Sequence, residues 1–144
     1  MSKFKIVSPD RRSVSIKPNG KNKKFILQYL KDETVNAIEG TFGIFVYNTL
    51  EQAKRDQYTF DGMFGNRVCR IIEVAPIGIG RHPQVCLSLH LELIEEFLGK
   101  MDYIQDLYYK ANTRFAINYK NRYLELWPCF EDEMMVYPAV KVLS

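Results

Sequence analysis

Residues that support metal or disulfide chemistry are scarce in this chain. It has two histidines and three cysteines, and Cys69, Cys86 and Cys129 form no C-x-x-C pair. Thiolate metal sites favour closely spaced ligands, and a secreted disulfide framework favours an even number of cysteines. Each cysteine lies among apolar residues, where a thiol acts as a small buried hydrophobe. The sequence therefore predicts no metal site and a reducing compartment.

Long apolar runs and a strong net charge are absent as well. No stretch of 18 apolar residues occurs, and the opening residues MSKFKIVSPD lack the apolar core of a signal peptide. With 47% hydrophobic residues and a formal charge of +3, the composition excludes bulk disorder. A length of 144 residues fits one ordinary domain. We expect a single compact domain over residues 1–144, soluble and cytoplasmic, with no membrane partner.

The small net charge conceals an asymmetry along the chain. Residues 1–31 contain nine Lys or Arg and one acid, which gives +8, and the remaining residues carry eleven basic and sixteen acidic side chains, which gives −5. A basic segment of this kind suits phosphates, RNA or an acidic partner. It contains no interleaved aromatic residues on which bases could stack. The sequence therefore argues against nucleic acid as the partner, and an exposed loop explains the lysines around Pro18 equally well.

Apolar spacing predicts one strand–helix pair clearly. Residues 44–47 (IFVY) form an apolar run that is typical of a buried strand. Thr49 is followed three residues later by Gln52, which is the capping-box spacing, so a helix is expected over residues 50–58.

The rest of the chain mixes both kinds of element. Residues 67–74 predict a strand that Pro76 halts, and the apolar spacing of residues 87–112 predicts the longest helix. Residues 25–38 fit either a helix or a mixed segment. Further strands are expected at 4–7, 13–16, 115–119, 123–127 and 134–143. The expected fold class is α+β.

Three pieces of the chain, in order, resemble landmarks of the ADP-ribosyltransferase fold, above all its poly(ADP-ribose)-polymerase-like branch. Residues 43–47 (GIFVY) and the helix after them resemble the family's strand and helix beside the nicotinamide. Residues 72–78 (IEVAPIG) resemble the strand and glycine turn that follow. Residues 131–137 (EDEMMVY) resemble the late strand opened by the catalytic glutamate. The resemblance implies a split sheet with packed helices and a groove for NAD or an ADP-ribose-like nucleotide.

The resemblance also implies roles for four residues. Glu133 falls at the position of the catalytic glutamate, where it would stabilise an oxocarbenium-like state. Phe45 would stack on the nicotinamide, and Arg11 or Arg12 would hold the pyrophosphate. The physical alternatives are core packing for Phe45 and a solvated acidic turn for residues 131–133.

Departures from the family leave catalysis open. The polymerase branch uses a histidine on an early strand, whereas His82 and His90 come too late. The arginine-modifying branch uses a Ser/Thr-x-Ser strand, and residues 41–43 (TFG) lack its final serine. The chain is then either a divergent enzyme or a scaffold that has lost its chemistry.

Other features give weaker expectations. Small phage-encoded proteins of unknown function have similar pieces, which implies a non-enzymatic alternative: a binding protein that inhibits a host protein complex or sequesters a nucleotide signal. Tyrosines between residues 103 and 123 suit a protein interface. Residues 78–82 (GIGRH) resemble a phosphate-binding loop, but they lack the third glycine and the Lys-Ser/Thr pair of a P-loop. The oligomeric state stays open.

Overall fold

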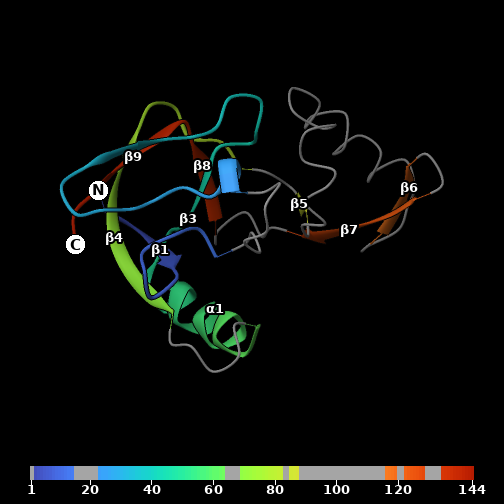
Figure 1. Cartoon of the computed structure of the whole chain (residues 1–144), viewed down its shortest axis with the longest axis horizontal. Coiled ribbons are helices and arrows are strands. Elements are labelled where there is room, and N and C mark those ends of the chain that lie inside the picture. Colours follow the sequence, from blue (N-terminus) through green and yellow to red (C-terminus); the bar gives the residue numbers. More distant parts are fainter. Residues whose placement is uncertain are drawn as a thin grey trace.

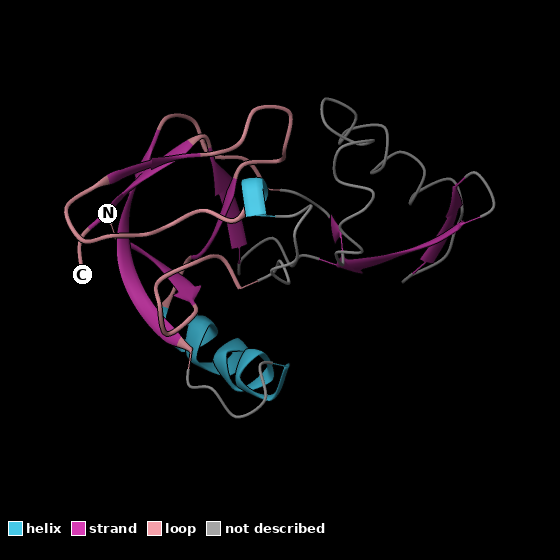
Figure 2. Cartoon of the chain, in the orientation of Figure 1, coloured by secondary structure: helices cyan, strands magenta, loops and turns pink. Residues whose placement is uncertain are grey.

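A sheet dominates the computed structural model, which describes residues 2–14, 23–63, 69–82, 85–87, 116–119, 122–128 and 134–144 (Figures 1 and 2). Strands are the commonest element among the described residues, which also include one α-helix and one short 3₁₀ turn, η1. In chain order the elements are β1 (Lys3–Val7), η1 (Lys23–Phe25), β2 (Thr34–Asn36), β3 (Ile44–Tyr47), α1 (Leu50–Met63), β4 (Arg70–Ile77), β5 (Val85–Leu87), β6 (Ala116–Tyr119), β7 (Arg122–Pro128), β8 (Met134–Tyr137) and β9 (Ala139–Val142).

The main sheet has six strands in the order β2-β9-β4-β1-β3-β8, and every pair in it is antiparallel. Only Pro138 separates β8 from β9. β8 pairs with β3 and β9 pairs with β4, so this one stretch of chain links strands that lie on either side of β1. The long, curved β4 is prominent in Figure 1.

The larger of two buried clusters draws on β1, β2, β3, β4 and β9. It is made mainly of β-branched side chains, which suit the pleated surface of a strand. Alternate residues of each strand face it, as the period of two requires. Its buried members are Val7, Tyr29, Val35, Ile44, Val46, Ile72, Val74, Val140 and Val142.

The second cluster lies between the outer face of the sheet and α1, which covers β1, β3 and β4 (Figure 1). Ala53 of the helix is fully buried there, beside Ile6 and Tyr47. The Thr49 hydroxyl accepts a hydrogen bond from the Gln52 amide, and the Gln52 side chain accepts one from the Thr49 amide, both at 3.2 Å. The capping box, the helix and the buried strand at 44–47 are therefore confirmed.

One prediction about strand ends is wrong. β4 does not stop before Pro76 but runs through it to Ile77. β1 begins at Lys3, opposite Val74, so residues 75–77 of β4 pair only with β9. A proline lacks an amide donor, and such a one-sided stretch of strand tolerates that loss.

Other predictions are met in part. Strands occur at 116–119, 122–128 and 134–142, the last split by Pro138. Residues 25–38 are the mixed segment, with η1 and β2. Residues 85–87 form a strand, which removes Leu87 from the expected helix, and the rest of that helix lies outside the described residues. Ser13 makes only a single bridge, to Val7, and residues 15–16 lie outside the described part.

The fold class is thus a small, sheet-rich mixed fold. A separate three-stranded antiparallel sheet has the order β5-β7-β6. None of the helices within the described residues is long and apolar enough to cross a membrane.

Candidate functional site

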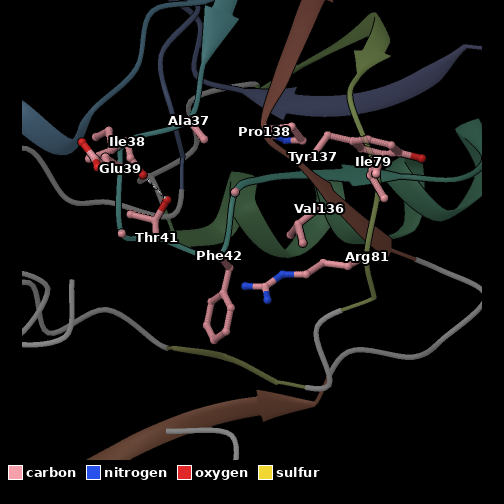
Figure 3. Close-up of a pocket in the computed structure, with 12 residues that line it drawn as sticks. Ala37, Ile38, Glu39, Thr41, Phe42, Ile79, Arg81, Val136, Tyr137 and Pro138 are labelled. Carbon is pink, nitrogen blue, oxygen red and sulfur yellow. Dashed lines mark hydrogen bonds between the residues drawn. The ribbon is translucent and has the colours of Figure 1, made fainter. Parts of the chain in front are cut away.

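A groove of about 380 Å³ opens where the loop before β3 faces the turn after β4 (Figure 3). Its volume lies within the usual range for small-molecule sites, roughly 300–1,000 Å³. Residues 37–43 form one wall, Ile79 and Arg81 form the other, and residues 136–138 lie between them.

Two glycines allow the turn after β4 to fit closely against the strand behind it. A Cβ atom at Gly78 would lie 2.5 Å from a ring carbon of Pro138, and one at Gly80 would lie 2.5 Å from a ring carbon of Tyr137. No side chain fits at such distances without movement of its neighbours. Between these glycines, Ile79 has 92% of its surface exposed. The turn therefore holds an apolar side chain out at the rim of the groove.

Arg81 follows this turn and is fixed by its backbone. Its amide donates to the Val136 carbonyl at 3.0 Å, and its carbonyl accepts from the Val136 amide at 2.9 Å. The exposed side chain extends along the groove, with the guanidinium carbon 5.6 Å from the centre of the buried Phe42 ring. Figure 3 shows the guanidinium beside that ring. A cation in this position can bind an anion that enters the groove.

The opposite wall depends on backbone shapes that favour glycine. Gly40 has φ of +85° and Gly43 has φ of +126°. A Cβ at Gly43 would lie 2.8 Å from the Tyr137 carbonyl oxygen. The Thr41 hydroxyl donates to the Ile38 carbonyl at 2.7 Å, which closes the turn between the glycines. This wall is therefore shaped by a local hydrogen bond and by its close approach to Tyr137.

The two arginines expected to hold a pyrophosphate lie elsewhere. Arg11 donates from Nε to the Tyr29 carbonyl at 2.7 Å and from its terminal nitrogen to the Ser144 carbonyl at 2.5 Å. Arg12 pairs with Asp10 at 3.4 Å and contacts Gln28 at 3.3 Å, all on the surface. Neither residue lines the groove. Arg11 thereby fastens three separate segments of the chain together.

Phe45 lies in the middle of β3 and is half-buried. Its ring makes an edge-to-face contact with Phe42 at 6.3 Å between centres. It is not among the residues that line the groove, although it supports one that is. Glu133 lies outside the described residues, and so do most of the tyrosines expected at an interface. None of Arg11, Arg12 and Phe45 lines the groove, and the roles given to these residues and to Glu133 stay predictions.

Lys5 of β1 is a further charged group among apolar residues. Its Nζ donates to the Phe45 carbonyl at 2.9 Å and lies 5.1 Å from the centre of the Tyr29 ring. Desolvation lowers the pKa of Lys5 to about 8. Burial also raises the pKa of Tyr29 above its usual value. The ammonium supplies a donor to a carbonyl where β1 and β3 pair only at Phe4 and Tyr47.

Sequence reasoning missed Arg81 and Phe42 as site residues. The signal that could have found them was the glycine pair of residues 78–82, because a turn too tight for side chains often approaches another backbone or a ligand closely. Comparing residues 78–82 only with a P-loop overlooked this close approach. His82 at its end places Nδ1 3.1 Å from the Met134 carbonyl oxygen, which can only accept.

Comparison with known proteins gives no relative to draw on: no family model, curated protein or solved structure matches the chain. Within the described residues, no group of three or more His, Cys, Asp or Glu side chains could hold a metal ion.

Proposed function

We propose that this chain is a ligand-binding domain that holds an ADP-ribose-like nucleotide, such as NAD, in the groove beside residues 37–43. The observation that carries the proposal is the position of Arg81, whose guanidinium lies against Phe42 at the edge of a groove of about 380 Å³. The resemblance of residues 43–47 and 72–78 to the ADP-ribosyltransferase fold supports the choice of nucleotide. These two segments lead into the groove walls.

The chemistry of the walls suits the two parts of such a ligand. Arg81 can donate two parallel hydrogen bonds to a phosphate. Ile38, Ile79 and Pro138 offer apolar surface for the base or the ribose. The sequence assigned the pyrophosphate to Arg11 or Arg12. In this proposal Arg81 holds the pyrophosphate instead.

We propose that the nucleotide is bound and not cleaved. Cleavage of NAD needs a carboxylate near the developing positive charge of the ribose. Glu39, which lines the groove, is exposed, and exposed carboxylates stabilise such a charge weakly. Holding a nucleotide intact is also what a protein that sequesters a nucleotide signal requires.

Titration calorimetry of NAD and ADP-ribose against the full chain tests the proposal. Replacing Arg81 by alanine should weaken binding about 10- to 100-fold, because a hydrogen bond from a charged donor is lost. Arg70→Ala is the matched control, since Arg70 is an exposed arginine at the far end of β4, about 20 Å along the strand from the groove. Its affinity should equal that of the wild type.

A nicotinamide-release assay on the same preparation separates binding from catalysis. We expect no release above background. Steady release that Glu133→Gln abolishes would make the chain an enzyme. No binding of any adenine dinucleotide would overturn the proposal and leave a protein partner as the remaining interpretation.

A further inference from the structure

We infer that a second copy of this chain docks on the groove face, so that two copies form a symmetric dimer. The inference goes beyond nucleotide binding and does not depend on it. It starts from the position of Ile79, which is the most exposed large apolar side chain in the described part of the molecule. Ile79 lies at the rim of the groove, where it could contact the groove of a second copy.

Ile79 lies on a turn whose backbone packs closely against Tyr137 and Pro138. Gly78 and Gly80 on either side of it lie so close to Pro138 and Tyr137 that neither tolerates a Cβ without movement of its neighbours. A flexible loop could fold an isoleucine back onto the protein, but this turn leaves 92% of Ile79 exposed. Ile77, two residues earlier, is 41% exposed. Exposed apolar groups gathered beside a groove mark interaction sites.

The face is also complementary to itself in charge. Glu39 and Arg81 are both exposed and both line the groove. They come from opposite walls, and Figure 3 shows them on opposite sides of it. A two-fold axis between them brings Arg81 of each copy opposite Glu39 of the other. The same rotation sets each Ile79 over the partner's residues 37 and 38, which are apolar. An isologous interface needs this kind of self-matching.

The expected dimer is weak, because a single groove and its rim bury less than the roughly 1,200 Å² of a stable interface. It should form in a concentration-dependent manner, with half-association at about 10 µM to 1 mM. The dimer covers the groove, so a bound nucleotide and a second copy would exclude each other.

Sedimentation equilibrium of the full chain over that concentration range tests the inference. The wild type should dimerise, and Ile79→Asp should weaken association about tenfold or more. Arg70→Glu is the control: it reverses an equally exposed arginine away from the groove and should leave dimerisation unchanged. The circular dichroism melting curve of each variant should match that of the wild type.

Reversing the charges of Arg81 and Glu39 gives a further test, in which recovery of a dimer on mixing two variants shows that both variants are folded. Arg81→Glu alone and Glu39→Arg alone should each lose dimerisation, because each places like charges opposite one another. Mixing these two variants should restore a dimer that contains one copy of each, since both contacts across it are then attractive. A monomer at every concentration, a dimer that survives Ile79→Asp and Arg81→Glu, or no recovery on mixing would overturn the inference.

Discussion

Two arginines, Arg11 and Arg81, mark opposite uses of the same side chain. Arg11 donates to the carbonyls of Tyr29 and Ser144, which joins a turn, a loop and the residues after β9. Arg81 is fixed by its own backbone and lies exposed over Phe42 in the groove. The comparison teaches that the contacts around an arginine, more than the charge itself, decide whether it joins parts of the fold or lies exposed at a groove.

The groove wall gives the largest expected effect. Gly43→Ala should lower the free energy of unfolding by about 2–4 kcal/mol, because a Cβ at φ of +126° would lie 2.8 Å from the Tyr137 carbonyl oxygen. Chemical denaturation measures the loss. Ala37→Gly, on the same wall, is the contrasting change and should cost about 1 kcal/mol or less. Equal losses for the two variants would contradict the close packing assigned to Gly43.

The next prediction concerns Lys5, whose ammonium donates to the Phe45 carbonyl but is largely removed from water. Below pH 8 it is charged in both states, so folding carries the whole desolvation cost. Between about pH 8 and its usual pKa of 10.5, the folded state loses the proton while the unfolded chain keeps it, so stability should rise with pH. The gain by pH 10 is about 2–3 kcal/mol.

Tyr29 limits that rise, because its raised pKa keeps the folded phenol protonated while the unfolded chain ionises above about pH 10. Stability should then fall again. Urea denaturation at intervals of pH measures the profile, and Lys5→Met should remove the rising limb while leaving the fall. A rising limb of the same size in Lys5→Met would rule out Lys5 as its source.

Replacing Arg11 by alanine should cost about 1–3 kcal/mol of stability, because two backbone carbonyls lose a charged donor. Nucleotide affinity should stay at the wild-type value. Thermal denaturation and calorimetry on the same sample measure both. A loss of affinity with unchanged stability would return Arg11 to the ligand site that the sequence suggested.

Arg81→Ala gives the smallest effect on stability, at most about 1 kcal/mol for an exposed cation–π contact. Its large effect should fall on ligand affinity. A stability loss as great as that of Arg11→Ala would erase the distinction between the two arginines.

Local signals were sufficient for much of the fold. The strand at 44–47 follows from an apolar run, and the helix after it follows from the capping-box spacing of Thr49 and Gln52. The strand, the helix and both capping-box hydrogen bonds are present. The extension of β4 through Pro76 could not be read locally. It depends on β1 beginning opposite Val74, which is a property of the neighbouring strand.

The site was harder to predict for the same reason. Arg11 and Arg81 both follow turns and look alike in sequence, and their difference arises from contacts with Ser144 and Val136, far along the chain. Phe45 was singled out because it stands in the middle of an apolar strand, yet the ring that reaches the groove is Phe42, just before that strand.

The most direct test is nuclear magnetic resonance of the labelled chain during titration with ADP-ribose. If the groove beside Arg81 is the binding site, amide signals of residues 40–43 and 79–81 should shift together in a saturable manner. Those of Arg11, Tyr29 and Ser144 should stay in place. Shifts centred on Arg11 and Tyr29, or no shifts at millimolar ligand, would contradict the assignment of the site to this groove.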